Sequence, residues 1–142
     1  MAVRDPRADQ ALAILRVVVG IVFMAHGYQK FFVMGVGGVT GFFDSLGVPL
    51  PGIAAPAIAT LEFVGGAFLV AGLLARPIAF FLMCDVLTAL FLVHLGNGFF
   101  VPRGIELVMT LAGGALAIAL GGAGAVSADR ALAARRARGR LS

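Results

Sequence analysis

Charged side chains are scarce in this chain, and that scarcity excludes a water-soluble protein. Only 13% of the 142 residues are Asp, Glu, Lys or Arg, whereas a soluble domain has about 25%. Hydrophobic residues make up 61% of the chain, and the mean hydropathy is +1.04. A surface with so few charges would not dissolve in water, so the sequence indicates an integral membrane protein.

Cysteine is nearly absent as well. The chain has one cysteine, Cys84, within an apolar run. One thiol forms no internal disulfide, and without a C-x-x-C pair the chain has neither a dithiol redox centre nor a zinc site of that type. We predict that Cys84 is a small buried packing residue. The sequence has no flavin motif and no cysteine cluster, so it carries no recognisable electron donor of its own.

Long apolar runs account for most of the sequence, and their pattern predicts helices. Runs such as 21–25 do not alternate between apolar and polar residues, as the strands of a membrane barrel would. In lipid each backbone N–H and C=O must be paired within the protein, which a helix achieves. A span takes about 20 residues, so we predict an all-α, integral membrane four-helix bundle. The predicted spans are 11–34, 53–75, 78–95 and 104–120.

The segments between the predicted spans are rich in glycine and proline. We predict a turn-prone loop over residues 35–52, because these residues interrupt helices. Pro56 would lie in the first turn of the second span, where its missing N–H costs little. Residues 76–77 would join spans two and three as a short hairpin. A further loop is expected at 96–103, and Ser127 would cap a helix in the tail.

Lysine and arginine are distributed unevenly between the two sides of the predicted bundle. Nine of these cations would lie on the side of the two termini, and two on the opposite side. Cytoplasmic loops carry such an excess, so both termini are predicted to be cytoplasmic. The nine are Arg4, Arg7, Arg16, Arg76, Arg130, Arg135, Arg136, Arg138 and Arg140, against Lys30 and Arg103.

This topology divides the chain into three parts. We expect a cytoplasmic N-terminal segment at 1–10, a membrane domain at 11–122 and a basic cytoplasmic tail at 123–142. The first apolar run is long and lacks an A-x-A cleavage signature, so it should be retained. The net charge of +4 and the pI near 10.6 reflect the flanking arginines and not nucleic-acid binding. The basic tail either fixes topology alone or also contacts anionic lipid.

Ionisable side chains within spans cost about 2.5–3.5 kcal/mol each at the bilayer centre, so they are candidate functional residues. At a rise of about 1.5 Å per residue, His26 lies about 22 Å and His94 about 24 Å from the cytoplasmic ends of their spans. Glu62 lies about 13 Å below the outer end of its span. We predict that these residues share one outward-facing pocket. Its predicted ligand-binding residues are His26, Gln29, Lys30, Glu62, His94, Asn97 and Glu106.

Two more ionisable residues, Arg16 and Asp85, are expected nearer the cytoplasmic side, about 7 and 10 Å into their spans. We predict a structural ion pair between them, or contact of each with lipid head groups. Asp85 and His94 are nine residues apart, so on a straight helix they would face opposite directions. A continuous proton or ion path along this span is therefore not expected. No metal site is predicted.

Five short motifs, in their order along residues 12–120, are similar to one known family. They are H-G-Y-Q-K-F-F at 26–32, G-F-F-D-S-L-G-V-P at 41–49, L-E-F-V-G-G at 61–66, H-L-G-N-G-F-F at 94–100 and G-I-E at 104–106. With these motifs the chain resembles the DoxX family. The resemblance implies a four-helix bacterial inner-membrane protein associated with oxidoreductase systems, including a thiosulfate:quinone oxidoreductase. The positions that match the family's polar residues are His26, Lys30, Glu62, His94, Asn97 and Glu106.

Two functions remain open at this point. In the first, the protein is a redox-linked accessory subunit whose outer pocket binds a quinone or a similar small molecule, and an oxidoreductase partner subunit supplies electrons. Histidine and lysine can hydrogen-bond quinone oxygens, and a carboxylate can exchange the accompanying proton. In the second, the protein is a non-enzymatic anchor or assembly module of a larger complex, and its polar residues hold helices together.

Two other hypotheses are less favoured. His26 and His94, at one level on two helices, could ligate a haem, although nothing in the sequence requires one. Transport is disfavoured because the chain is short and its polar stripe is broken, unless the protein forms a homo-oligomer. The sequence predicts neither a substrate nor a catalytic residue, so whether the protein is an enzyme stays open.

Overall fold

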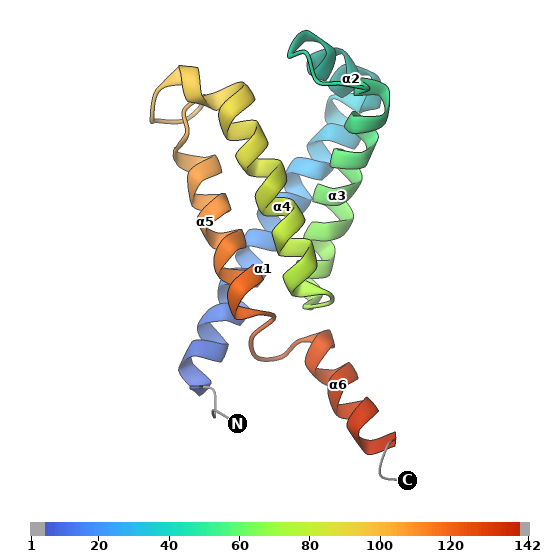
Figure 1. Cartoon of the computed structure of the whole chain (residues 1–142), viewed down its shortest axis with the longest axis vertical. Coiled ribbons are helices and arrows are strands. Elements are labelled where there is room, and N and C mark those ends of the chain that lie inside the picture. Colours follow the sequence, from blue (N-terminus) through green and yellow to red (C-terminus); the bar gives the residue numbers. More distant parts are fainter. Residues whose placement is uncertain (1–4, 140–142) are drawn as a thin grey trace.

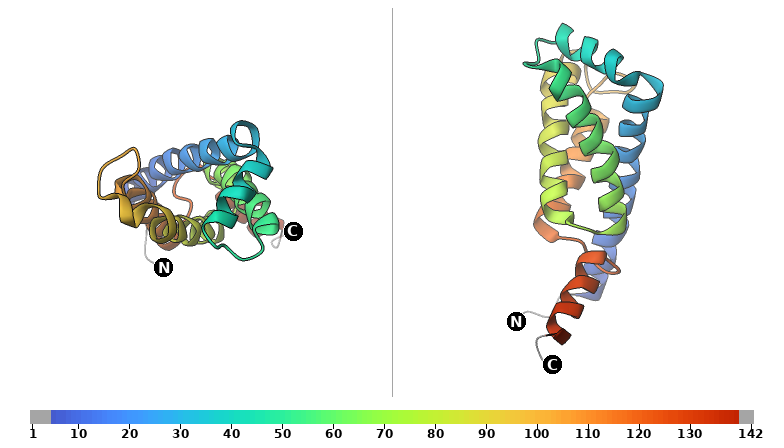
Figure 2. Two further views of the ribbon diagram at one scale, coloured as in Figure 1. Left: turned by 90° about the horizontal axis from the view of Figure 1, so that it is seen from above. Right: turned by 90° about the vertical axis from the view of Figure 1, so that its right-hand side faces the viewer.

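The computed structural model describes residues 5–139, and all regular structure in that range is helical (Figure 1). Arg4 and Arg140, which entered the predicted topology, lie outside the described residues. Four helices run antiparallel along the long axis, one helix lies across their far end, and another extends from the near end (Figures 1 and 2). In chain order the α-helices are α1 (Pro6–Tyr28), α2 (Gly35–Ser45), α3 (Pro51–Ala71), α4 (Ala75–Ala89), α5 (Glu106–Gly121) and α6 (Ala128–Gly139).

Two of the long helices continue past their α-helical part into wider turns. α1 runs on into the π-helical segment Gln29–Val33. α4 runs on into the π-helical segment Leu90–His94 and then into a single 3-10 turn, Leu95–Asn97. A π-helix bonds each N–H to a carbonyl five residues earlier and often occurs at functional sites. Both wider turns lie in the half of the bundle nearer α2 (Figure 1).

Within residues 5–139, three helical stretches are long and apolar enough to cross a bilayer: Pro6–Val33, Pro51–Ala71 and Ala75–Asn97. α5 is apolar as well, but its 16 residues rise only about 24 Å, less than the hydrocarbon thickness of about 30 Å. The predicted all-helical membrane class is thus confirmed, whereas a fourth span stays a prediction. α1 begins earlier than expected, at Pro6, because Asp5 accepts a hydrogen bond from the Arg7 backbone N–H and caps the helix.

The glycine-rich segment predicted as a loop is helical over Gly35–Ser45, and the prediction was wrong there. Its glycines lower helix propensity, but α2 packs across the ends of α1 and α3 (Figure 2). Val39 on its inner face is 1% exposed. This tertiary packing stabilises a helix that the local sequence alone disfavours. α2 ends before Gly47, whose φ of +73° reverses the chain toward α3.

The connection between α3 and α4 lies at residues 72–74, earlier than the predicted turn at 76–77. Residues 76–77 are instead in the first turn of α4. α4 can begin early because the Asp129 carboxylate accepts hydrogen bonds from the N–H groups of Leu74 and Ala75, at 2.8 and 3.0 Å. Pro56 also lies further along its helix than expected, because α3 begins at Pro51.

The four long helices form two closely packed pairs, α1 with α3 and α4 with α5. A Cβ atom on Gly27 would lie 2.3 Å from the Phe63 backbone nitrogen, and one on Gly66 would lie 2.6 Å from the Met24 nitrogen. Small residues therefore let the backbones of α1 and α3 touch, as is common in lipid. The two pairs diverge toward α2, which gives the bundle a V-shaped outline (Figure 1). Buried residues such as Leu69 and Ile118 join the pairs below that opening.

At the end of the bundle opposite α2, charged groups bind the backbone and one another. Arg16 is 2% exposed, and its guanidinium donates to the carbonyl oxygens of Leu69 at 2.6 Å, Val70 at 2.9 Å and Val126 at 3.2 Å. Asp9 forms an ion pair with Arg130 of α6, and the Ser127 hydroxyl accepts a hydrogen bond from the Arg130 N–H, which confirms the predicted cap. We call Asp9, Arg16, Asp129 and Arg130 the tail-end cluster.

The predicted ion pair between Arg16 and Asp85 is wrong. Arg16 donates its hydrogen bonds to backbone carbonyl oxygens. Asp85 lies beside Lys30 and Glu62 in the opposite half of the bundle. α4 begins at Ala75, so Asp85 is about 15 Å from the start of its helix, further than was expected from a start at residue 78. Cys84, expected to be buried, is exposed on the outer side of α4.

Candidate functional site

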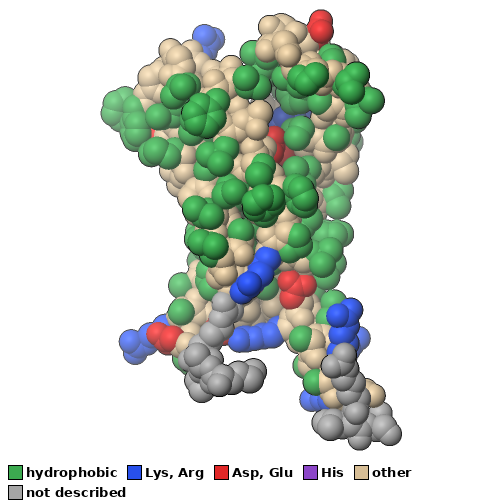
Figure 3. All heavy atoms as spheres, in the orientation of Figure 1, with side chains coloured by type: hydrophobic (Ala, Val, Ile, Leu, Met, Phe, Trp, Pro, Cys, Tyr) green, Lys and Arg blue, Asp and Glu red, His purple; other side chains and the backbone are tan. Residues whose placement is uncertain are grey.

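A cavity of about 190 Å³ lies among the four long helices in their α2-side half. Acidic and basic side chains are visible in the notch between the two upper lobes of the molecule (Figure 3). We call this space the polar cavity. Its ionisable lining residues are His26, Lys30, Glu62, Asp85 and His94. Its other lining residues are Phe23, Val86, Ala89, Pro102, Leu107, Val108 and Leu111.

A short ion pair crosses from the first helix to the third beside this cavity. Lys30 is in the π-helical segment that follows α1, and its Nζ donates to Glu62 Oε2 on α3 at 2.5 Å. The Glu62 side chain is 8% exposed and the Lys30 side chain 20% exposed. A buried carboxylate without a partner is strongly destabilising, so Lys30 stabilises Glu62 in this position.

Asp85 on α4 brings a second carboxyl group to the same place. It lies beside Glu62 and close enough to Lys30 for electrostatic interaction with both. With both carboxyls ionised and the amine protonated, these three groups sum to a formal charge of −1, and one added proton neutralises them. Two carboxyl groups and one amine, from three different helical segments, therefore meet beside the polar cavity.

The two histidines of the polar cavity are held in the same way. His26 Nδ1 bonds to the carbonyl oxygen of Val22 at 2.9 Å, and His94 Nδ1 bonds to the carbonyl oxygen of Arg103 at 2.8 Å. A carbonyl only accepts, so each Nδ1 must be the donor. In a neutral ring the other nitrogen, Nε2, then has a free lone pair. Each ring is fixed by its backbone contact and can accept a hydrogen bond through Nε2.

Of the seven residues predicted to share a pocket, the structure brings His26, Lys30, Glu62 and His94 together and leaves three outside. Gln29 is exposed. Asn97 donates from Nδ2 to the Val93 carbonyl at 2.7 Å. Glu106 accepts at Oε1 from the Val101 N–H at 2.8 Å. Asn97 and Glu106 thus fix the chain between α4 and α5.

Asp85 is the cavity residue that sequence reasoning misplaced. Asp85 and His94 were expected to face opposite directions, yet both line the polar cavity. The reason is the π-helical segment Leu90–His94, whose wider turns advance by a smaller angle per residue than an α-helix. Asp85 and His94 therefore lie on one side of this helix, contrary to the prediction of a broken polar stripe. No pattern in the sequence indicates a π turn, so a straight-helix projection could not place His94 and Asp85 on the same side of the helix.

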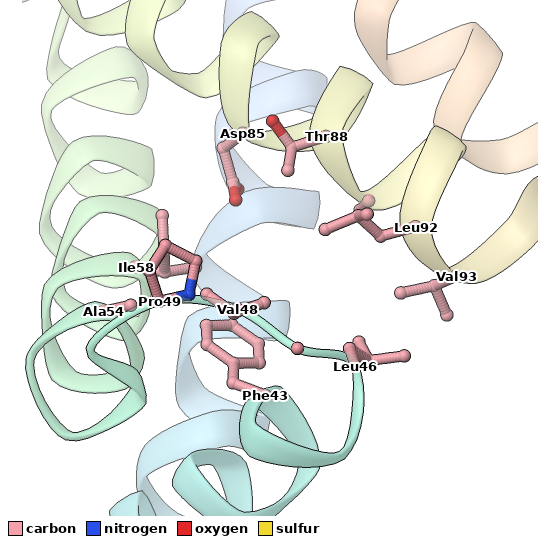
Figure 4. Close-up of a pocket in the computed structure, with 12 residues that line it drawn as sticks. Phe43, Leu46, Val48, Pro49, Ala54, Ile58, Asp85, Thr88, Leu92 and Val93 are labelled. Carbon is pink, nitrogen blue, oxygen red and sulfur yellow. The ribbon is translucent and has the colours of Figure 1, made fainter.

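A second cavity, of about 370 Å³, lies between α4, the start of α3 and the connection from α2 (Figure 4). We call it the apolar cavity. Its described lining residues are Phe43, Leu46, Gly47, Val48, Pro49, Ala54, Ile58, Asp85, Thr88, Ala89, Leu92 and Val93. Among them Asp85 alone is charged, and its carboxyl group points into the space near Ile58 and Pro49 (Figure 4). Asp85 and Ala89 line both cavities.

Within the part of the chain that the structure describes, no group of three or more His, Cys, Asp or Glu side chains could hold a metal ion. The polar cavity is instead a set of hydrogen-bonding and proton-exchanging groups. Its lysine can donate, its histidines can accept at Nε2, and its two carboxyls can take up a proton.

A family model describes the same region. The DoxX model matches residues 11–95, a range that includes all five ionisable residues of the polar cavity. The chain belongs to the DoxX family. It is 33% identical over 129 residues to "Inner membrane protein YqjF" of Escherichia coli K12, covering 87% of this chain and 93% of that one. It is 30% identical over 125 residues to "Inner membrane protein YphA" of the same strain, covering 84% and 88%.

A third relative has a name that refers to chemistry. The chain is 37% identical over 82 residues to "Putative oxidoreductase CatD" of Bacillus subtilis 168, covering 58% of each chain. No solved structure matches this chain. Together with the three membrane-length apolar stretches, these relatives identify a DoxX-family membrane protein whose homologues are bacterial inner-membrane proteins.

Proposed function

We propose that this DoxX protein is a redox-linked accessory subunit of an inner-membrane oxidoreductase system, and that its polar cavity binds a quinone or a similar small molecule. The observation that carries the proposal is the convergence of His26, Lys30, Glu62, Asp85 and His94 around one cavity within a membrane bundle. Each such group is costly in lipid. Five of them around an open volume favour a ligand site over a purely structural contact.

The chemistry of these groups fits a carbonyl-bearing ligand that takes up protons. Lys30 can donate a hydrogen bond to a quinone oxygen, and the carboxyls of Glu62 and Asp85 can supply or accept a proton. A bound quinone would supply the electron-accepting chemistry. His26 and His94, which keep Nε2 free, can accept hydrogen bonds from a reduced, hydroxyl-bearing form of the ligand.

The electrons have to come from elsewhere, because the sequence has no flavin motif and no cysteine cluster. An oxidoreductase partner subunit, or a substrate that reaches the cavity, would supply them. The name of the Bacillus subtilis relative supports a redox context. The proposal leaves the catalytic role with the partner and gives this chain the binding of the ligand.

The proposed topology has four spans, with both termini in the cytoplasm. α1 begins and α6 lies at the same end of the molecule (Figure 1), as an even number of crossings requires. The shorter α5 would complete the fourth span with the help of residues 104–105. The described cations other than Lys30 and Arg103 belong to the end that carries α6, which supports a cytoplasmic location for that end. Residues 1–10, 11–122 and 123–142 are the corresponding segment, membrane domain and tail.

Absorption spectroscopy tests this function directly. Protein is purified in mild detergent from its native membranes, and an oxidised-minus-reduced difference spectrum is recorded. We expect a quinone signal that co-purifies with the protein and is lost in His26→Ala and Glu62→Gln. Glu106→Gln is the matched control, because Glu106 lies outside the polar cavity, and it should keep the signal. A featureless spectrum of the unaltered protein, together with no retention of added ubiquinone, would overturn the proposal.

A non-enzymatic anchor or assembly module is the second candidate, and the direct Lys30–Glu62 ion pair favours it. This bond joins the π-helical continuation of α1 to α3. In an assembly module it would hold the two helices together. Lys30→Met would then lower the yield of an assembled complex without altering electron transfer by the complex that remains. Identifying the proteins that co-purify with each variant separates the two functions.

A further inference from the structure

The polar and apolar cavities are neighbours that share part of a wall. Asp85 and Ala89 stand one helical turn apart on α4, and both residues line both cavities. Between them these residues present one carboxyl group and one methyl group at the junction. A molecule that extended from one cavity into the other would therefore pass Asp85.

The two cavities differ in what they can bind. Apart from Asp85 and Thr88, the described residues around the apolar cavity have no polar side chain. The Thr88 hydroxyl already donates to the Cys84 carbonyl oxygen at 2.9 Å. Ordered water needs two to four polar partners, which this lining does not provide. Hydrocarbon suits the apolar cavity, whereas the polar cavity suits a hydrogen-bonding group.

The volumes of the two cavities lead to the same assignment of head group and hydrocarbon chain. Sites for small ligands have volumes of about 300–1,000 Å³. The polar cavity, at about 190 Å³, falls below that range and has room for a small head group only. The apolar cavity, at about 370 Å³, falls within it. A ligand with a small polar head and a hydrocarbon chain would use both.

The position of the apolar cavity points to the membrane as the source of this ligand. Leu92, on the cavity wall, is 49% exposed, and its neighbour Phe91 is 66% exposed. This π-helical continuation of α4 therefore faces lipid. The cavity lies where the α1–α3 pair and the α4–α5 pair diverge, and α2 packs mainly on α3 and on the π-helical continuation of α1 (Figures 1 and 4). A chain from the bilayer can enter there sideways.

We propose that the apolar cavity holds the hydrocarbon chain of a membrane-soluble amphiphile, whose small hydrogen-bonding head group reaches the polar cavity past Asp85. The inference rests on the proposed function for the head group and adds the chain, its location and a lateral route of entry from lipid. A water-soluble ligand of the polar cavity would not occupy the apolar cavity.

Two photoreactive ubiquinone analogues test the proposal in nanodiscs of Escherichia coli polar lipid. One analogue carries a diazirine at the end of a ten-carbon chain, and the other has no chain and carries the diazirine on the ring. Mass spectrometry of the labelled peptides locates each group. We expect the chain analogue to label residues 46–49 and 88–93, with excess decylubiquinone as competitor removing the label. The ring analogue should label the helices around the polar cavity.

Two variants of α3, one inside the apolar cavity and one outside it, sharpen the test. Ala54→Phe fills the apolar cavity without altering the polar cavity, and Ala57→Phe adds the same ring one turn on, at an exposed position. We expect Ala54→Phe to reduce competitor-sensitive labelling by the chain analogue about tenfold, because the chain loses its apolar contacts. Ala57→Phe should leave labelling unchanged, and the ring analogue should label both variants normally. Melting temperatures in detergent show that each variant is folded.

The outcomes separate the new inference from the proposed function. Ring labelling of the polar cavity, combined with chain labelling that spreads over lipid-facing helices and ignores Ala54→Phe, overturns the lateral route and keeps the quinone site. In another outcome, a photoreactive phospholipid labels the apolar cavity in a competitor-sensitive way while neither quinone analogue labels it. That result supports an amphiphilic ligand in the apolar cavity and overturns quinone as its identity. Absence of specific labelling by all three probes overturns both. If Ala54→Phe does not fold, the smaller Ala54→Leu replaces it, with Ala57→Leu as its exposed control.

Discussion

The two ends of this bundle both contain buried charge, and they differ in what the charges bind. In the tail-end cluster, Arg16 and Asp129 direct their hydrogen bonds to backbone carbonyl and N–H groups. In the polar cavity, Lys30 and Glu62 bond to each other beside an open volume. Arg16 and Asp129 hold helices in place through the backbone, whereas the ionisable groups of the polar cavity converge on one space among the long helices. An ionisable residue in a membrane span can therefore hold helices together or line a ligand site, and its hydrogen-bond partners distinguish the two roles.

The largest expected effect is on stability at the tail end. Arg16→Ala removes a cation that donates to three carbonyl oxygens from two separate parts of the chain. We expect the free energy of unfolding to fall by about 3 kcal/mol or more, because buried hydrogen bonds to charged groups contribute about 1.5–3 kcal/mol each. Thermal unfolding in detergent, followed by circular dichroism, measures the change. Arg76→Ala, at an exposed position of α4, is the control. Equal melting temperatures for both variants would contradict the structural role of Arg16.

In the polar cavity, stability and binding should separate. Lys30→Met leaves the Glu62 carboxylate buried without its cation and should lower the free energy of unfolding by about 2–3 kcal/mol. The double variant Lys30→Met/Glu62→Gln removes both charges and should recover most of that loss, yet still fail to bind quinone. Melting temperatures and quinone retention, measured on the same samples, give the two quantities of a double-mutant cycle. Recovery of binding along with stability would show that the pair is structural only.

A smaller effect is expected at the start of α4. Asp129→Ala leaves the N–H groups of Leu74 and Ala75 without their side-chain acceptor and should cost about 1 kcal/mol, as for other lost helix caps. Quinone retention should not change, because both cavities lie at the opposite end. Thermal unfolding and quinone retention are compared with those of Asp44→Ala, an exposed aspartate in α2. A loss of binding in Asp129→Ala would show that the two ends are coupled.

Glu106→Gln should have the smallest effect. A glutamine amide oxygen can still accept the hydrogen bond from Val101, so we expect a change in unfolding free energy within about 0.5 kcal/mol. Retention of quinone should also match the unaltered protein. Since the sequence placed Glu106 in the pocket and the structure does not, loss of retention in this variant would favour the sequence prediction.

The membrane class, the three membrane-length helices and four of the residues around the polar cavity follow from the sequence, because they depend on composition and on a regular rise along a helix. His26 and His94, for example, were matched in depth by counting residues, and both line the polar cavity. What counting could not provide is rotation about the helix axis. Two π-helical segments shift that rotation near Lys30 and His94, so His94 lies on the same side of its helix as Asp85, and Asp85 lies further along α4 than expected because the helix begins at Ala75.

Other errors arose where a distant part of the chain overrides local propensity. α2 is helical in spite of its glycines, because Val39 is buried against neighbouring helices. α4 begins before residues 76–77 because Asp129, far along the chain, supplies its cap. Local sequence carries no trace of either contact. Arg16 likewise binds carbonyls of α3, which have no side-chain signature that would reveal an acceptor.

The cap from Asp129 also determines the order in which the protein can be completed. The residue that accepts the Ala75 N–H lies 54 positions later in the chain, and the Val126 carbonyl that binds Arg16 lies 110 positions after it. During synthesis, the α3–α4 hairpin and the α1 arginine are made well before these partners exist. The α1 arginine and the α3–α4 hairpin therefore enter the bilayer with these polar groups still open, and residues 126–129, which are made later, close them. The segment that leads into α6, although it lies outside the apolar core, thus completes contacts on which α1 and α4 depend.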